Sequence, residues 1–350
     1  MSLQYVAGGL AGFRIIDRTA RDDRRPGRKG CTARDLRLRF SFEGDACELG
    51  RLPLTTWKIG STTVTRVGEL LGFASLPPEE FFVEFDRDLL GRHLGWLVPN
   101  HYSKEHNRLI TSVHSWLIRT ERHTILLDCC AGNHKNRPGL ERFHQLDTPF
   151  LQRLREAGAG PEDIDIVLCT HLHSDHVGWN TMLRDGRWVP TFPNAKYLFS
   201  RIENDWGDPR RNPAIAGDLM RANSYLDSVL PVIEAGQAEL IEAPFSIDYT
   251  LLIEPAPGHT RGHVVLKLNV RNEKAVFCGD AMHHPLQVYA PHWNSRFCEV
   301  IDEARTTRRC ILDHCAEHRA LLFPIHFGVP HVVEIAHAGD GFSLRFVDAV

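Results

Sequence analysis

The sequence lacks any apolar run of roughly 18 residues, the length that crosses a bilayer, and its start lacks the cationic segment of a signal peptide. Its nine cysteines are odd in number and form no CxxC pair, which favours reduced thiols in the cytoplasm. The formal net charge is only -3, from 41 basic and 44 acidic residues. No global positive field therefore exists to hold nucleic acid or an anionic membrane. These absences predict a cytoplasmic protein with neither kind of partner.

Histidine is the residue type that is present in excess. The chain has 350 residues, of which 43% are hydrophobic and 24% are charged, as in an ordinary globular protein with a sizeable core. Its 20 histidines exceed what a structural core requires. Because histidine is the commonest metal ligand in proteins, this excess indicates a metal site.

The N-terminal region differs in composition from the rest of the chain. Residues 14–39 are dominated by arginine and aspartate and show no sustained periodicity. We expect residues 1–53 to form a loosely ordered arm of basic and mixed charge, and residues 54–350 to form one domain. A basic arm can bind an anionic partner, but a solvated tail is the simpler interpretation.

Short strands outnumber helices in the remainder. They occur in two runs, each followed by helical segments, with no repeat at a fixed period. Two β-rich halves packed face to face with helices outside satisfy this order, which predicts a layered α/β fold. We expect strands at 57–67 (a hairpin), 110–118, 124–127, 164–169, 196–199, 238–241, 250–253, 263–270, 274–278, 321–325 and 342–347, and helices from 77 and over 147–157, 216–233 and 299–318.

The expected strand at 164–169 leads into the segment THLHSDHVG, which holds four candidate metal ligands. His171 and His173 are two residues apart, so they point the same way as the strand ends and one ion can be bound by both. Asp175 and His176 lie beyond the bend and can serve a second ion a few ångströms away. No helix or strand face requires this pattern, so a metal site is the favoured interpretation.

Three further candidates follow apolar strands downstream. His259 lies in the segment PGHTRGH, where the glycines permit a tight turn that presents the side chain. Asp280 ends the segment VFCGD, and His326 ends the segment LFPIH. Polar residues at strand ends can converge at one edge of layered sheets. We therefore expect these three to share one metal pocket with the first four.

These motifs, in this order over about residues 57–326, resemble those of the metallo-β-lactamase-fold hydrolases. The resemblance implies a four-layer αββα sandwich with a dinuclear metal site at one edge. Two divalent ions per chain are implied, usually zinc, with manganese or iron as alternatives. The implied ligands are His171, His173 and His259 for the first ion and Asp175, His176 and His326 for the second, with Asp280 bridging the two.

The resemblance also implies a reaction. Two ions that share Asp280 also share a water and lower its pKa towards neutrality, so that a hydroxide attacks the substrate. Asp175 can orient this hydroxide and accept its proton. The spacings from His259 to Asp280 and from Asp280 to His326, 21 and 46 residues, resemble those of the acyl-homoserine lactonase and methyl parathion hydrolase branch. The expected substrate is a small lactone or related carboxylic ester.

Other functions are compatible with the same ligands. A phosphotriesterase or arylesterase similar to methyl parathion hydrolase differs mainly in the pocket walls. β-Lactam hydrolysis is disfavoured because Asp175 and Asp280 follow the lactonase pattern, and a diiron oxygen reductase is expected to carry glutamate in place of His173. A catalytically inactive binding protein is a further alternative, although seven buried ligands without metal are costly to keep. The sequence also leaves a homodimer open.

Residues around the pocket are predicted one by one rather than from motifs. Small lactonases carry a tyrosine three positions after the bridging aspartate, where this chain has His283; we expect His283 to polarise the substrate carbonyl in its place. Asp128 is a candidate to orient a metal ligand. Cys129 and Cys130 are expected to pack, since no basic neighbour activates a thiolate. The residues expected to line an apolar cleft are Trp179, Phe81, Phe82, His284 and Trp293.

Overall fold

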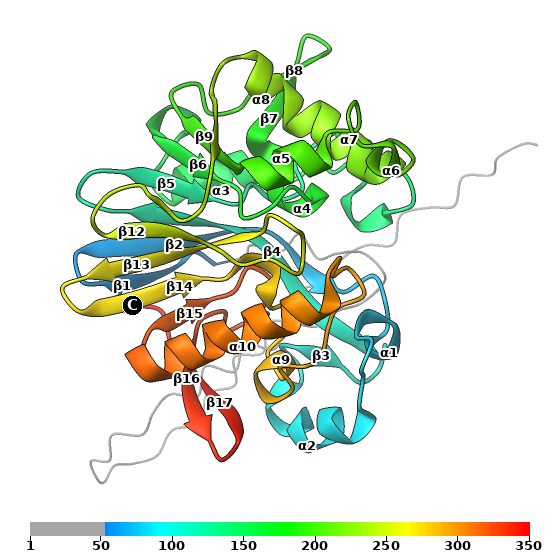
Figure 1. Ribbon diagram of the computed structural model, residues 1–350, viewed down its shortest axis with the longest axis vertical. Coiled ribbons are helices and arrows are strands. Elements are labelled where there is room, and N and C mark those ends of the chain that lie inside the picture. Colours follow the sequence, from blue (N-terminus) through cyan, green and yellow to red (C-terminus); the bar gives the residue numbers. More distant parts are fainter. Residues whose placement is uncertain (1–52) are drawn as a thin grey trace, which may run out of the picture. The chain divides into compact units, whose positions relative to one another are not determined.

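The computed structural model describes residues 53–350, so the expected N-terminal arm lies outside the described residues except for its last position. Two large β-sheets face each other in the described part, with helices on their outer surfaces (Figure 1). The α/β four-layer sandwich predicted from the sequence is therefore confirmed.

The first sheet combines antiparallel and parallel pairs. Its strands are β1 (Thr55–Ile59), β2 (Thr62–Phe73), β3 (Tyr102–Ser103), β4 (Arg108–Arg119), β5 (Thr124–Leu127), β6 (Ile166–Leu168), β9 (Lys196–Ser200) and β10 (Ala238–Ile241). They follow the order β1-β2-β4-β5-β6-β9-β10, with β3 paired to β4. The long strands β2 and β4 are antiparallel, whereas β5, β6, β9 and β10 are parallel to one another.

The second sheet is antiparallel except for one pair. Its strands, in sheet order, are β11 (Phe245–Ser246), β12 (Leu251–Pro255), β13 (Val264–Val270), β14 (Glu273–Phe277), β15 (Leu321–Phe323), β16 (Val333–Ala338) and β17 (Gly341–Phe346). β14 and β15 are parallel, so the loops that follow them leave the sheet at the same edge. A separate hairpin is formed by β7 (Thr181–Arg184) and β8 (Arg187–Pro190).

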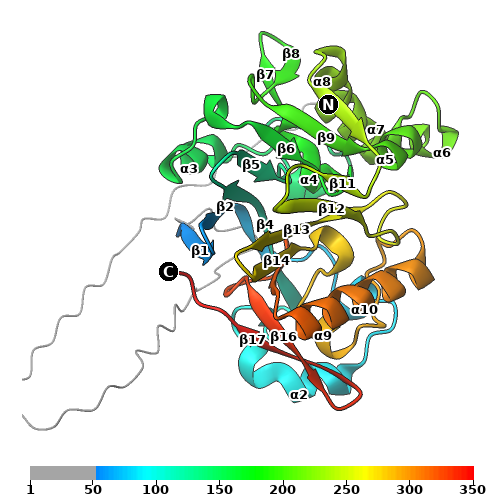
Figure 2. The ribbon, with the colours of Figure 1, turned by 60° about the vertical axis from the view of Figure 1, so that its left-hand side comes forward.

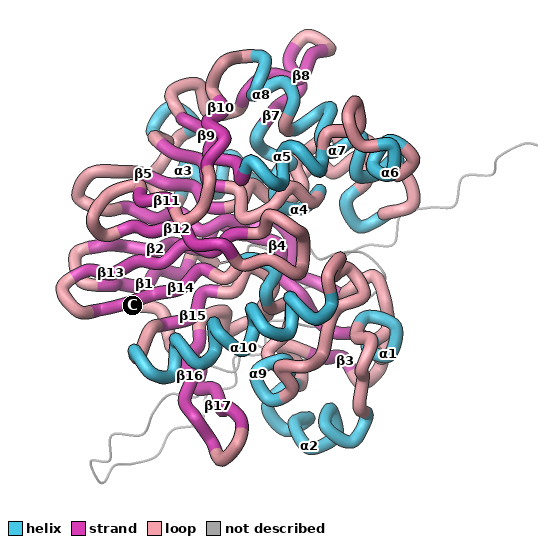
Figure 3. The backbone as a smooth tube through the Cα atoms, in the orientation of Figure 1, coloured by secondary structure: helices cyan, strands magenta, loops and turns pink. Residues whose placement is uncertain are grey.

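Helices cover both outer faces, as the tube in Figure 3 shows. They are α1 (Pro78–Phe81), α2 (Arg87–Leu97), α3 (Phe150–Glu156), α4 (Ser174–Val177), α5 (Arg201–Gly207), α6 (Pro213–Ala216), α7 (Leu219–Ser228), α8 (Leu230–Glu234), α9 (Leu286–Tyr289) and α10 (Ile301–His318). Short 3-10 turns occur at Glu141–Phe143, Pro161–Asp163, Gly178–Asn180 and Gly279–Ala281. Among residues 53–350, none of the helices has the length and apolar character to cross a bilayer.

Aromatic side chains fill the space between the two sheets. Trp57 of β1 and Trp116 of β4 meet edge to face, with ring centroids 5.6 Å apart. Both contact Phe323 of β15 across the sandwich, at 6.1 and 5.1 Å. All three side chains are buried, so this cluster fixes one sheet against the other.

The outer layers bury the apolar stripes of the helices. Leu154 of α3, Tyr225 of α7 and Val232 of α8 belong to the core on the outer face of the first sheet. Ile311 and Leu312 of α10 belong to the core on the outer face of the second sheet, which α10 crosses in Figure 2. The amphipathic pattern predicted for 299–318 therefore corresponds to a real packing face.

One expectation about secondary structure is corrected, and one strand was missed. The single helix expected at 216–233 is two helices, because α7 ends at Ser228 and α8 begins at Leu230 with Pro231 in its first turn. Proline lacks the N–H that would continue the hydrogen-bond ladder of α7. The expected last strand is present as β17, but its hairpin partner β16 was not predicted.

Candidate metal centre

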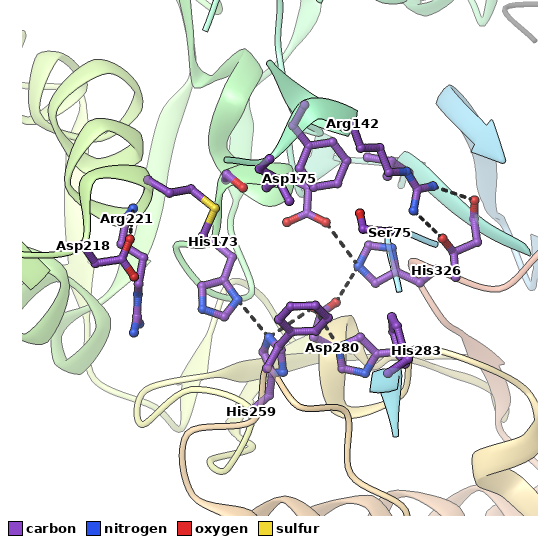
Figure 4. Close-up of a pocket in the computed structure, with 18 residues that line it drawn as sticks. Ser75, Arg142, His173, Asp175, Asp218, Arg221, His259, Asp280, His283 and His326 are labelled. Atoms are coloured by element: carbon purple, nitrogen blue, oxygen red, sulfur yellow. Dashed lines mark hydrogen bonds and ion pairs between the residues drawn. The ribbon is translucent and has the colours of Figure 1, made fainter. Parts of the chain in front are cut away.

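The seven candidate ligands come together at one edge of the sandwich, on the loops that follow β6, β12, β14 and β15. Figure 4 labels His173, Asp175, His259, Asp280 and His326 among them. The seven form two groups, and within each group one ligand atom of every residue lies within 4.8 Å of those of the others. The first group consists of His171, His173, His259 and Asp280, and the second group consists of Asp175, His176 and His326.

The loop after β6 supplies ligands to both groups. His173 is the extended residue that precedes α4, whereas Asp175 and His176 lie within that short helix. The change from extended to helical backbone turns the later pair away from the first. Nε2 of His171 and Nδ1 of His173 are 3.0 Å apart, and Nε2 of His259 is also 3.0 Å from Nδ1 of His173. Three ring nitrogens therefore face a common point.

Asp280 lies between the two groups with one oxygen toward each. Its Oδ2 is 3.1 Å from Nε2 of His259 and 3.7 Å from Nε2 of His171. Its Oδ1 is 2.9 Å from Nε2 of His326 and 3.2 Å from Nε2 of His176. This division of its oxygens suits a carboxylate that bridges two metal ions, one oxygen to each.

Nε2 of His176 and Oδ1 of Asp280 are buried at the centre and make no hydrogen bond of acceptable geometry, although they lie 3.2 Å apart. Leaving such atoms unpartnered is costly, and native structures rarely do so. Five imidazoles and two carboxylates, with their donor atoms directed at two points, form a ligand set that divalent transition metals prefer. The residues therefore fit two divalent cations.

In the second group, the ring nitrogens that face away from Asp280, called the outer nitrogens below, contact a carboxylate and a backbone carbonyl. Nδ1 of His176 lies 3.0 Å from Oδ2 of Asp128, whose other oxygen accepts the backbone N–H of Thr170 at 2.7 Å. Nδ1 of His326 donates to the carbonyl oxygen of Ser112 at 2.8 Å. Such contacts fix the orientation of a ligand ring and leave the opposite nitrogen free to bind metal.

The outer nitrogens of the first group have weaker partners. Nδ1 of His171 lies 3.1 Å from the hydroxyl oxygen of Thr170. Nδ1 of His259 lies 3.9 Å from Sγ of Cys298. Neither ring is held by a carboxylate or a carbonyl in the way that the rings of the second group are.

Burial sets the charge of these side chains. Burial lowers the pKa of His171 and His173 well below the ordinary histidine value and lowers that of His259 to about 3. For His176 burial acts in the same direction, but the carboxylates of Asp280 and Asp128 raise its pKa well above the ordinary value. The first group therefore presents neutral imidazoles at pH 7, the form that binds metal.

A cavity opens on the centre. Apolar side chains dominate its walls, and two arginines and an aspartate lie at its sides in Figure 4. The wall residues are Ser75, Phe81, Thr111, Val113, Leu140, Arg142, Phe143, Asp218, Met220, Arg221 and Phe297, and the floor is formed by His173, Ser174, Asp175, His259, Asp280, His283 and His326.

A buried ion pair holds two of these walls together. The guanidinium of Arg137 donates to both carboxylate oxygens of Asp227, at 2.7 and 2.8 Å. Lys135 is also buried there and donates to the hydroxyl oxygen of Thr181 at 2.6 Å. The segment with Leu140, Arg142 and Phe143 is thereby attached to α7, which carries Met220 and Arg221. The sequence analysis missed these wall residues.

Among the expected wall residues, Phe81 lines the cavity and Trp179 does not. Trp179 is buried instead, where its ring stacks on Phe150 with centroids 5.4 Å apart. Its Nε1 donates to Oε1 of Glu69 at 2.6 Å. The position three residues after His176 returns to the core because the 3-10 turn at Gly178–Asn180 reverses the chain.

Phe82, His284 and Trp293 are likewise not wall residues, which corrects the expectation for them. The rings of Phe82 and Trp293 pack on each other at 5.3 Å within a separate core cluster. His284 is fully buried and its Nε2 donates to the carbonyl oxygen of His101 at 2.9 Å. Adjacent residues on one short segment point in opposite directions, so Phe81 faces the cavity and Phe82 the core.

His283 does lie in the cavity floor. Its Nε2 is 3.3 Å from Oδ2 of Asp280 and 3.3 Å from the hydroxyl oxygen of Ser295, and its Nδ1 is buried without a partner. Burial lowers its pKa, so the ring is neutral at pH 7. Cys129 and Cys130 are buried in the core, and burial raises the pKa of both thiols well above the ordinary value.

Comparison with known proteins agrees with this geometry. Residues 110–308 match the family model of the metallo-beta-lactamase superfamily. No curated protein matches the sequence.

Several solved structures share the fold. The hydrolase AbOPH of the β-lactamase superfamily superposes with a TM-score of 0.70 at 22% identity, over 85% of this chain and 97% of that one. AidC, a dizinc quorum-quenching lactonase, gives 0.66 at 20% identity, over 85% and 98%. AiiA of B. thuringiensis, with N-decanoyl-L-homoserine at its active site, gives 0.53 at 17% identity, over 77% and 94%.

Proposed function

This chain belongs to the metallo-beta-lactamase superfamily, and from that premise we propose that it is a dinuclear metal-dependent hydrolase that cleaves a lactone or related carboxylic ester. One observation carries the proposal. The two oxygens of Asp280 each face a separate group of ring nitrogens, which is the arrangement of a bridging ligand between two ions.

The ligand groups assign the ions to residues. His171, His173 and His259 would hold one ion, and Asp175, His176 and His326 the other, with Asp280 shared. When bound, two divalent ions, most simply zinc, supply a nucleophile that is active at neutral pH and Lewis-acid stabilisation of developing negative charge.

Two side chains of the cavity floor can act on the substrate directly. Asp175 lines the cavity and its Oδ2 is 3.6 Å from Nε2 of His326, so a carboxylate is available to accept the proton of the attacking water. His283 is neutral and can donate one N–H to the carbonyl or leaving oxygen of the substrate. We assign the base role to Asp175 and the donor role to His283.

The cavity walls favour an ester with an apolar part. Phe81, Val113, Leu140, Phe143 and Phe297 surround the opening above the ligands. Burying an apolar acyl or alkyl group against them is favourable by about 25 cal/mol per Å² of apolar area. AidC and AiiA, both of the same fold, bind acylated homoserines, which supports placing lactones first among the candidate substrates.

A substrate panel tests the proposal. Wild-type protein loaded with zinc, manganese or iron is assayed on lactones with short and long acyl chains, on aryl esters and on phosphotriesters. We expect the highest kcat/KM on a lactone or carboxylic ester. Preference for phosphotriesters would instead indicate a phosphotriesterase, the alternative function that uses the same metal ligands. Two bound ions without turnover of any substrate would leave a binding protein.

A further inference from the structure

A buried glutamate outside the ligand loops joins the two loops that carry the first ligand group. Glu203 lies on α5 and is 5% exposed. Its Oε2 accepts the backbone N–H of Leu172 at 3.2 Å, and its Oε1 accepts the backbone N–H of Gly262 at 2.8 Å. One side chain therefore binds the chain at positions 172 and 262.

Both N–H groups that Glu203 binds lie close in sequence to candidate metal ligands. Leu172 separates His171 from His173, and its N–H belongs to the peptide that joins His171 to Leu172. Gly262 lies three residues after His259, in the same loop. A shift of either peptide would move a ligand nitrogen, and the loops also meet at their ligand ends, where Nε2 of His259 is 3.0 Å from Nδ1 of His173.

The close packing of Gly262 is independent evidence that the His259 loop is located by α5. A Cβ at Gly262 would lie 2.6 Å from the backbone nitrogen of Glu203 and 2.8 Å from Cβ of Ile202. Only glycine permits this approach. The loop is therefore pressed against the start of α5, and the Glu203 carboxylate is within reach of its backbone.

Burying a carboxylate is expensive, so stability of the core does not explain Glu203. An ionised carboxylate loses its hydration on burial, and hydrogen bonds return only part of that cost. An apolar residue would fill the same space without this loss. What the carboxylate adds is a pair of directed acceptors that fix the separation of two backbone N–H groups.

We propose that Glu203 is a positioning residue that presets the first ligand group for its metal ion. The inference rests on the proposed function in so far as that group binds a metal. The effect falls on one ion rather than on both, because His176 and His326 of the second group are oriented by Asp128 and Ser112. Preset ligands avoid the cost of ordering two loops when the ion binds.

Zinc binding to Glu203→Gln tests this. The amide keeps one acceptor but turns an N–H donor toward a backbone N–H, so one of the two contacts is lost without a change of volume. Zinc is measured by elemental analysis and by competition with a chromogenic chelator on the full chain. We expect one of the two ions to bind about 10- to 100-fold more weakly, the range seen when a partner of a ligand is removed. The other ion should bind as in wild type.

A second variant reaches the same loop without changing the carboxylate. Gly262→Ala should push the loop from α5 and weaken the same single ion, so the test survives if Glu203→Gln fails to fold. The matched control is Asp205→Asn on the same helix, where the half-exposed aspartate accepts from Nδ2 of Asn204 at 3.3 Å and pairs with the exposed Arg211 at 3.4 Å, and contacts neither ligand loop through these bonds. This control should bind two zinc ions with wild-type affinity.

Two results would overturn the proposal. In one, both ions weaken equally; in the other, zinc affinity is unchanged and only the melting temperature of the metal-free protein falls, as for a merely structural residue. The measurement needs no substrate, so it is separate from the proposed reaction. Selective loss of one ion from a protein that turns over no ester would uphold the role of Glu203 and reject the esterase.

Discussion

The two ligand groups share one carboxylate but are held in place differently. In the second group, His176 and His326 have their outer nitrogens on the Asp128 carboxylate and the Ser112 carbonyl, at 3.0 and 2.8 Å. In the first, the outer nitrogens of His171 and His259 meet a hydroxyl and a thiol, at 3.1 and 3.9 Å. The rings of the second group are oriented side chain by side chain, whereas the first depends on where its loops are placed.

The pKa values of the side chains also differ between the two ligand groups. Although burial raises the pKa of Asp280, the facing histidines, His176 foremost, hold it well below the ordinary value. Burial on its own would lower the pKa of His326, but the neighbouring Asp280 carboxylate raises it above the ordinary histidine value. The raised pKa values favour protonated imidazoles in the second group beside Asp280, while the imidazoles of the first group stay neutral. Removing either kind of support should affect one ion more than the other.

Asp280→Asn should have the largest effect, because it removes the candidate ligand that, among residues 53–350, faces both groups. Its amide nitrogen would face ring nitrogens where a carboxylate oxygen is needed, so both ions should bind more weakly. We expect kcat/KM to fall on the order of 1000-fold or more, together with zinc content measured after gel filtration. Retention of two ions and of activity would show that Asp280 does not bridge.

The next largest effect should come from removing one ligand of a single group, which tests whether the two groups bind separate ions. His171→Ala and His326→Ala should each reduce the metal content from about two ions per chain to about one. The melting temperature should fall in both, since metal binding contributes to folding free energy. Elemental analysis of the two variants side by side measures this. If either variant loses both ions or neither, the division into two groups is wrong.

His283 borders both ligand groups, and its substitution tests its role in catalysis. Its Nε2 approaches Oδ2 of Asp280, and its ring lies nearly parallel to that of His326, with centroids 5.8 Å apart. His283→Ala should reduce kcat about 10- to 1000-fold, as for loss of one oxyanion donor or general acid, with metal content unchanged. His283→Tyr should restore part of the rate on lactones. A rate within a few-fold of wild type on every ester would remove His283 from the mechanism.

The convergence of the seven candidate ligands could be predicted because their sequence signals are local. A two-residue spacing at a strand end, as in His171 and His173, indicates side chains on one side whatever surrounds them. Glycines beside His259 and Asp280 mark turns that present a side chain. The layered fold followed from the order of strands and helices for the same reason, since each element has its own periodicity.

The supports of the centre were not predictable, Asp128 excepted. Glu203 accepts hydrogen bonds from peptides 31 and 59 residues away in the sequence. A single glutamate in a short helix gives no sequence pattern from which these contacts could be predicted. Ser112 contributes only a backbone carbonyl, which any residue provides. Trp179 was misplaced because a local turn, rather than its distance from His176, decides which way its ring points.

Asp128→Asn should weaken one ion by a smaller amount than removal of a ligand. The variant keeps an acceptor for the Thr170 N–H but loses the carboxylate that orients His176. We expect the affinity of the second group for zinc to fall about 10- to 100-fold, measured by chelator competition, with a smaller loss at the first group, because Asp128 also accepts from the Thr170 hydroxyl beside His171. Equal weakening of both ions would mean that Asp128 supports the fold of the loop rather than one ring.

Cys298→Ala should have the smallest effect. It tests the weak contact between the Cys298 thiol and His259 of the first group. The thiol is a poor hydrogen-bond partner and lies 3.9 Å from Nδ1 of His259. Ordinary neutral hydrogen bonds contribute about 0.5–1.5 kcal/mol, so this longer contact should change zinc affinity by less than about threefold. Cys298→Ser is the matched variant, because its hydroxyl can accept from the imidazole without filling more space. If Cys298→Ala instead weakens zinc as much as Asp128→Asn does in the same competition assay, His259 is held by its side-chain partner after all. The first group would then not depend on the placement of its loops.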